Sequence, residues 1–264
     1  VINFTASASG TITNQAIDIF TDQNENIFLS KNNSQVFLKS TDGGTTWAAT
    51  GLNWAVNLQR VIRRVIIHPT STQTLLVASS VGIWRTTNGG TTWTQITTTS
   101  TYDLEFKPTD PNTVYATTAS GFYLSTNGGT SFTLISSGIP TTGANRMAVA
   151  VTANDPNYVY VLRSLNTTSG YGGLYLSNSS GTTFTVMSTT PDILANSCAG
   201  TAGNGQGWYD LALAASPLNK NEVIVGGINH WRSTDGGVNW TNIGCWNSTA
   251  ANPPYVHADV HEVE

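Results

Sequence analysis

The chain has 264 residues, of which 39% are hydrophobic and only 10% are charged, and its net charge at pH 7 is -4. Because its 11 Lys and Arg residues form no positive stripe that could neutralise phosphates, we expect no nucleic-acid partner. No stretch reaches the ~20 apolar residues that cross a bilayer, so we expect no membrane insertion. Val1–Gly10 lacks the pattern of a signal peptide, so an exported protein would be present here in its mature form.

Five short segments of one pattern divide the chain, and their first residues are 46, 39, 52 and 56 residues apart. Each lies between two short runs of β-forming residues, so we predict that each is the turn of a β-hairpin. The paired glycines allow positive φ angles, the Asp or Asn before them can accept backbone N–H bonds, and the closing Trp or Phe can pack beneath the hairpin. In chain order these segments, called the repeat turns below, are STDGGTTW (Ser40–Trp47), TTNGGTTW (Thr86–Trp93), STNGGTSF (Ser125–Phe132), SNSSGTTF (Ser177–Phe184) and STDGGVNW (Ser233–Trp240).

A second pattern precedes the repeat turns: an alternating strand, a turn that contains proline, and another strand. One example is Tyr102–Phe106, then Lys107–Asn112, then Thr113–Thr117. The two patterns together give four strands in about 45 residues, which is the size of a β-propeller blade, and no helical period competes with them. We therefore predict an all-β chain, with residues 1–264 in one propeller domain of four-stranded blades. The predicted blades cover about 15–55, 59–99, 100–137, 144–189 and 208–245, and 256–264 would be the first strand of a sixth.

The repeat turns resemble the Asp-box, also called the bacterial neuraminidase repeat, whose pattern is Ser-x-Asp-x-Gly-x-Thr-Trp. The resemblance covers the chain from about Gln15 onward. It implies a β-propeller like those of sialidases, xyloglucanases, sortilin-like receptors and photosystem assembly factors, but no single activity, because the box recurs in proteins of unrelated function. The fourth copy departs from the pattern at Ser179, and the second and third carry Asn88 and Asn127, so we expect weaker capping in those turns.

A narrower resemblance involves the stretches GQGWYDLALAASP, VGGINHWRSTDGG and YVHADVHEV. These look like large secreted surface proteins of Bacteroidota, many of them exported by the type IX system, which implies an extracellular or cell-surface location. A ring that stops after one strand of a sixth blade would leave backbone groups unpaired at its open end. We therefore expect these residues to belong to a longer polypeptide whose propeller has about six to eight blades.

The two cysteines, Cys198 and Cys245, lie in Gly- or Asn-rich stretches rather than in a zinc-binding pattern, so we expect a disulfide between them. In a propeller, the loops that lead into the first strand of each blade share one face with those that join the second and third strands. We call this the top face; the repeat turns lie on the opposite face. Both cysteines belong to top-face loops, Cys198 to the long loop Ser188–Gly207, so a disulfide would hold a binding surface rigid. We expect ligand groups on the top face and a structural role for the repeat turns.

Aromatic residues gather in the same loops, and two interpretations are open. Flat rings beside Asn and Thr suit the faces of sugars, whereas the same rings could pack in the seams between blades. Trp54 and Tyr171 would lie on this face as well. The candidate ligand-binding residues are Trp208, Tyr209, Asp210, Trp246, Tyr255, His257, Asp259 and His261.

Polar residues alternate along the predicted last strand, at His257, Asp259 and His261, so their side chains would share one face at the channel or its mouth. They could form a hydrogen-bonded polar strand, contact a ligand or hold a metal. A closed metal site usually draws on several strands, and we predict no metal here.

No catalytic signature identifies the chain as an enzyme. Asp103 and Asp210 are weak candidates for the two carboxyls of a glycoside hydrolase. A sialidase is disfavoured, because its Arg-Ile-Pro signature and its three arginines are missing, and no phosphate loop or dinucleotide fingerprint predicts a cofactor. The sequence favours an extracellular binding module that recognises a glycan or a protein. The alternatives are a glycoside hydrolase that resembles xyloglucanases and a protein-binding receptor that resembles sortilin.

Overall fold

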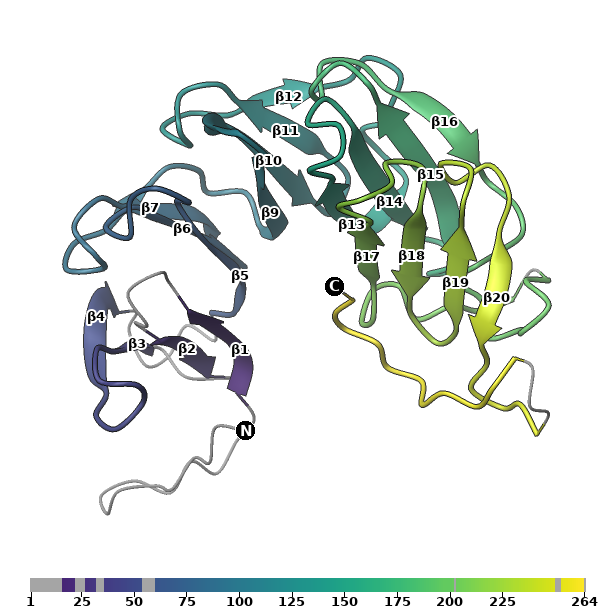
Figure 1. Ribbon diagram of the computed structural model, residues 1–264, viewed down its shortest axis with the longest axis horizontal. Helices are drawn as coiled ribbons and strands as arrows, with labels where there is room; N and C mark the ends of the chain where they lie inside the picture. Colours follow the sequence, from purple (N-terminus) through teal and green to yellow (C-terminus); the bar gives the residue numbers. More distant parts are fainter. Residues whose placement is uncertain are drawn as a thin grey trace. The chain divides into compact units, whose positions relative to one another are not determined.

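The computed structural model describes residues 16–21, 27–31, 36–53, 60–201, 203–249 and 253–263. The regular elements in these residues are β-strands, as the repeats predict. The described residues contain no helix that is long and apolar enough to cross a membrane. The strands form four-stranded sheets in which neighbours in the sheet are also neighbours in the chain (Figure 1). The chain divides into two compact units, Val1–Thr101 and Tyr102–Glu264.

The first unit holds two antiparallel sheets, and the first strands of the two sheets are in contact. A buried cluster that includes Phe37, Leu52 and Val77 forms its core. The strands of the first sheet are β1 (Ala16–Thr21), β2 (Ile27–Lys31), β3 (Val36–Ser40) and β4 (Ala48–Asn53), and those of the second are β5 (Ile62–Ile67), β6 (Leu75–Ser79), β7 (Gly82–Thr86) and β8 (Thr94–Gln95).

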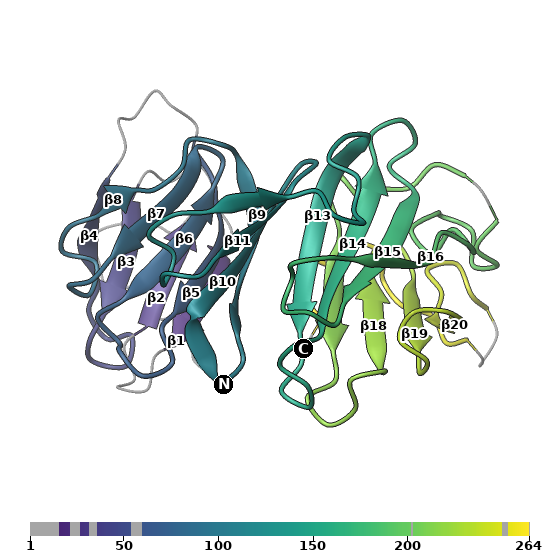
Figure 2. The same ribbon diagram turned by 90° about the horizontal axis from the view of Figure 1, so that it is seen from above.

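The second unit holds three sheets, the first of which starts at the unit boundary, and Figure 2 shows the fourth and fifth sheets side by side. The third sheet consists of β9 (Thr101–Lys107), β10 (Asp110–Thr118), β11 (Phe122–Ser125) and β12 (Thr133–Ile135). The fourth consists of β13 (Ala144–Val151), β14 (Val159–Leu165), β15 (Tyr171–Ser177) and β16 (Thr185–Ser188). The fifth consists of β17 (Ala212–Ala215), β18 (Val223–Gly226), β19 (His230–Ser233) and β20 (Thr241–Gly244).

The strand β14 shows how these sheets pack. Successive side chains of a strand point to opposite faces of the sheet. Tyr160 and Leu162 lie in a buried cluster with Trp231 of the fifth sheet, whereas Val159 and Val161 lie in a cluster with Phe122 of the third. Both faces of the fourth sheet are therefore covered, which explains why β14 is a continuous apolar run rather than a strand that alternates with polar residues. The last strands β12 and β16 are largely exposed.

The first repeat turn has the predicted hairpin geometry, between β3 and β4. Gly43 and Gly44 have φ angles of 69° and 89°, which favour glycine. The Ser40 hydroxyl accepts the Gly44 N–H at 2.8 Å, and an Asp42 carboxylate oxygen accepts the Thr46 N–H at 2.8 Å. The same two bonds recur in the second, third and fifth repeat turns, so the pattern is a device that closes the hairpin.

The fourth repeat turn keeps only the first of these bonds. The Ser177 hydroxyl accepts the Gly181 N–H at 2.9 Å, but the short Ser179 side chain accepts no bond from the Thr183 N–H. Ser180 also takes a φ angle of 56°, where the other turns have glycine. The capping of this turn is therefore weaker, as the departure from the pattern predicts.

Replacing Ser179 by Asp is expected to raise the free energy of unfolding by about 1 kcal/mol, because a carboxylate reaches the unpaired N–H as an N-cap residue does. Urea unfolding at pH 7 measures the change. Ser179→Ala is the control and should bring no gain. An Asp variant that is less stable than the parent would contradict the role assigned to this position.

The predicted first strand of a sixth blade at 256–264 is not present. Residues 256–263 form no strand, and Asp259 has a φ angle of 75°, which is incompatible with an extended chain. The physical reason is that this segment crosses the ends of the fifth sheet's strands, so it makes single bonds to them, such as that of the Val260 N–H to the Gly227 carbonyl, and among the described residues no strand runs alongside it. The five other blade ranges each contain one sheet, while their union in a single domain stays a prediction.

Candidate functional site

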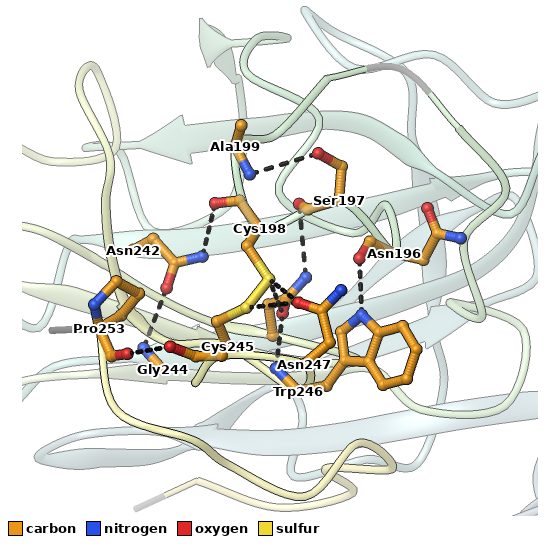
Figure 3. Close-up of a disulfide and its surroundings, with 12 residues drawn as sticks. Asn196, Ser197, Cys198, Ala199, Asn242, Gly244, Cys245, Trp246, Asn247 and Pro253 are labelled. Carbon is orange, nitrogen blue, oxygen red and sulfur yellow. Dashed lines mark hydrogen bonds between the residues drawn. A yellow bond between two sulfur atoms is a disulfide. The ribbon is translucent and has the colours of Figure 1, made fainter. Parts of the chain in front are cut away.

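The top face of the fifth sheet carries the predicted disulfide, which the structure confirms. Cys198 and Cys245 are 47 residues apart in sequence, and their Cα atoms are 5.5 Å apart, an ordinary disulfide separation. The bond joins the long loop between β16 and β17 to the loop that follows β20 (Figure 3). These two loops therefore form one connected surface.

Hydrogen bonds reinforce the connection between the two loops. The Trp246 ring donates to the Asn196 carbonyl at 2.7 Å, and the Asn242 amide donates to the Cys198 carbonyl at 2.9 Å (Figure 3). The fully buried Asn229 accepts the Trp246 backbone N–H and donates to the Ala195 carbonyl. Asn229 follows β18, so it ties both loops to the sheet beneath them.

The residues after the second loop cross the top end of the fifth sheet, and we call residues 255–261 the crossing segment. Tyr255 forms a bridge with Cys245, directly after β20. Val256 then packs against Gly244 and Val260 against Gly226, so closely that neither glycine has room for a Cβ. Figure 1 shows this path from the end of β20 towards β17.

Four predicted aromatic residues are exposed on this face. The exposed fractions are 60% for Trp208, 44% for Tyr209, 40% for Trp246 and 62% for Tyr255. No sheet that the structure describes covers these four rings, and their part in ligand binding stays a prediction. Trp208 and Tyr209 have ring centroids 5.4 Å apart, so they form one continuous aromatic surface.

Tyr171 does not belong to this surface. It is buried in the core between the fourth and fifth sheets, and its hydroxyl bonds to that of Ser188 at 2.8 Å. Its position at the start of β15 placed it near the top face in sequence, but the side chain points into the seam. Trp54 lies outside the described residues.

The polar residues His257, Asp259 and His261 are exposed on the crossing segment, and the residues that alternate with them, Val256, Ala258 and Val260, are half-buried. Exposed and half-buried side chains therefore alternate along this segment as predicted, although the segment is not a β-strand. The His261 ring meets the Tyr209 ring edge to face, with centroids 4.7 Å apart. Among the described residues, no three His, Cys, Asp or Glu side chains converge as a metal site would require.

Asp210 lies at the base of this surface, just before β17. It is only 1% exposed, and neither of its carboxylate oxygens has a hydrogen-bond partner of normal geometry among the described residues. Burial raises the pKa of Asp210 from 3.8 to about 7, and the nearby Asp259 carboxylate adds to the rise. The positive charge of the Arg146 guanidinium acts in the opposite direction and lowers the pKa of Asp210. A carboxyl that holds its proton near neutral pH can act as an acid or accept a ligand bond.

Arg146 is a residue of this site that sequence reasoning missed. Its guanidinium donates to the Tyr209 carbonyl and lies over the Tyr102 ring, 5.7 Å from the centroid. It therefore links β9, β13 and the loop before β17. Since 63 residues separate Arg146 from Tyr209, no local pattern in the sequence could have indicated the contact.

Asp103, the other carboxyl candidate, serves the packing of the sheets. One of its oxygens accepts the Val149 N–H of β13 at 2.9 Å, and the other accepts the Leu104 N–H at 2.9 Å. This carboxylate therefore joins the third sheet to the fourth. Its proposed part in catalysis stays an untested prediction.

Comparisons with known proteins agree with this architecture. A family model described as Sortilin, neurotensin receptor 3, matches residues 34–142, and a search of curated proteins found no match. Among solved structures, an ancestral GH74 enzyme is 17% identical over 95% of this chain and 33% of its own, with a TM-score of 0.69. The fold is a β-propeller.

Two further solved propellers show the same likeness. The GH74 xyloglucanase of Xanthomonas campestris is 16% identical over 84% of this chain and 36% of its own, with a TM-score of 0.57. PorZ, a surface component of the type IX secretion system of Porphyromonas gingivalis, is 8% identical over 86% of this chain and 27% of its own, with a TM-score of 0.54. The chain thus spans about a third of the length of these proteins or less, and identities this low concern the fold alone.

Proposed function

We propose that this chain is an extracellular binding module, a propeller of the Asp-box type within a longer bacterial surface or secreted protein, and that its top face binds a glycan. One observation carries the proposal: Trp208, Tyr209, Trp246 and Tyr255 expose large aromatic surfaces on loops that a disulfide holds together. A contiguous exposed apolar patch on a protein surface commonly marks a binding site.

A glycan fits this surface better than a globular protein does. Sugar rings present C–H groups that stack on aromatic faces, and hydroxyls that bond to polar side chains. The polar side chains are present beside the rings, at His257, Asp259 and His261. A protein interface would instead combine its aromatic anchors with a larger apolar core. The disulfide also suits an oxidising, extracellular compartment.

Retention on polysaccharides tests the proposal. The complete polypeptide is incubated with xyloglucan and a panel of plant and microbial polysaccharides, and retention and release of reducing ends are both recorded. We expect retention that a Trp208→Ala, Tyr209→Ala double variant weakens at least tenfold, a loss of about 1.4 kcal/mol or more. No retention on any polysaccharide would overturn the glycan proposal and favour a protein partner, as a sortilin-like receptor would have.

A glycoside hydrolase is the second candidate, because of Asp210. A general acid needs a carboxyl that stays protonated near neutral pH, and the burial of Asp210 provides one. Hydrolysis needs a second carboxyl at a suitable separation, for which Asp103 or a residue from the rest of the longer protein is the candidate. GH74 xyloglucanases among the structural neighbours make xyloglucan the first substrate to assay. Release of reducing ends that Asp210→Asn abolishes would establish this function, and release that survives the substitution would exclude Asp210 as the acid.

A further inference from the structure

The exposed aromatic residues of the top face lie at the two opposite edges of the fifth sheet. Trp246 and Tyr255 adjoin β20, since Tyr255 bridges to Cys245 directly after that strand. Trp208 and Tyr209 precede β17, the strand at the other edge. Three strand spacings separate β17 from β20, so these two edge strands are about 14 Å apart.

A strip of polar side chains fills the interval between these aromatic pairs. The crossing segment runs from Tyr255 to the Tyr209 ring, and its half-buried side chains anchor it: Val256 at Gly244, and Val260 at Gly226. The Val260 N–H also donates to the Gly227 carbonyl at 3.2 Å. Because alternate residues are held down, His257, Asp259 and His261 all remain exposed along the strip.

We propose that this band takes a linear oligosaccharide, which lies along the crossing segment with one sugar ring stacked at each aromatic edge. The edge strands are about 14 Å apart, so a chain of several linked sugar rings can reach both aromatic pairs and a single sugar cannot. Imidazole and carboxylate groups between the edges bond the hydroxyls of the middle rings. This inference rests on the proposed glycan binding and adds the length and direction of the ligand.

The physical consequence is a dependence of affinity on chain length. A single sugar can contact only one aromatic edge. When a longer chain is bound at one edge, its other end is held close to the second edge, so the second contact forms at a high effective concentration. Affinity is therefore expected to rise at least a hundredfold between one ring and four, and to change by less than threefold between four and six. A site for one terminal sugar would show no such rise.

The experiment measures the dissociation constants of β-1,4-linked gluco-oligosaccharides of one, two, four and six rings by calorimetry, with xyloglucan retention on the same protein. Trp208→Ala tests the β17 edge. Trp246→Ala tests the β20 edge, and Tyr255→Ala tests it independently, because the Trp246 ring also bonds to Asn196. Leu218→Ala is the matched control, since Leu218 is 86% exposed in the turn between β17 and β18 at the opposite end of the same sheet.

Each edge variant should weaken binding of the six-ring ligand at least tenfold and leave the one- or two-ring ligands less affected, while Leu218→Ala changes nothing. Gly226→Ala should have a similar effect, because its Cβ displaces Val260 and with it the strip. Binding that is independent of chain length, or that needs only one edge, would overturn this inference and keep the proposed function. No retention of any oligosaccharide or of xyloglucan would instead count against glycan binding itself.

Discussion

Asp210→Asn is expected to raise the free energy of unfolding by about 3 kcal/mol at pH 7.5. The ionised carboxylate of Asp210 loses its hydration on burial, which destabilises the folded state, and the neutral amide does not carry this charge. The pKa of Asp210 is about 7 in the folded protein and 3.8 ordinarily, so the folded state holds the proton more tightly between these values. The stability that this proton confers is complete below about pH 4 and is lost as the pH rises to 7. The parent should therefore lose stability over this window.

The asparagine variant should show a flatter profile, and the two proteins should differ by less than about 1 kcal/mol at pH 4. Urea unfolding from pH 4 to 8 measures both profiles. Asp235→Asn is the control of opposite sign, because backbone and side-chain bonds from Asn239 lower the pKa of Asp235. That substitution should destabilise the protein at neutral pH. An Asp210 variant less stable than the parent at pH 7.5 would show that the ionised carboxylate is well stabilised in the fold.

Removal of the disulfide has the second large expected effect. Replacing Cys198 and Cys245 together by Ser should lower the free energy of unfolding by about 4 kcal/mol, because the bond closes a long loop and restricts the unfolded chain. The 47-residue separation is what sets this magnitude. The same change should also free the loop that carries Trp246, so that binding at the β20 edge weakens.

Urea unfolding of the double variant measures the loss, and the parent protein in reducing agent is its control. Since the chain has only two cysteines, both samples should lose the same amount. A loss below about 1 kcal/mol would mean that the bonds of Asn242 and Trp246 already hold the loops, and that the disulfide adds little.

The repeat turns explain why the fold could be predicted so far. Each one is local: Ser40, Asp42, Gly44 and Thr46 make their bonds within five residues of one another, so the composition of the segment suffices to specify the hairpin. Five such hairpins at similar spacing imply the four-stranded sheets. The disulfide could be predicted for a different reason, since two cysteines allow a single pairing.

The sequence predicted which residues the candidate site contains, but it did not predict how their side chains are arranged. Trp208 and Tyr209 are exposed. The position of Tyr171 in the sequence predicted that it would lie on the same face, but its side chain is buried in the core. An alternating pattern also predicted a strand over His257–His261, and the alternation of exposure is present without the strand. Alternation specifies which side chains face solvent, but a strand needs a neighbour that accepts its hydrogen bonds.

By itself, the sequence determined the turns, the number of strands in each repeat and the residues available on the loops, because these depend on contacts within a few residues. Only the tertiary structure decided that Asp210 is buried with no hydrogen-bond partner of normal geometry among the described residues, and that Arg146 meets Tyr209. It also decided that the crossing segment joins two aromatic edges. These features depend on contacts between residues far apart in sequence, and the chain acquires them only when the sheets pack and exclude water from the seams between them.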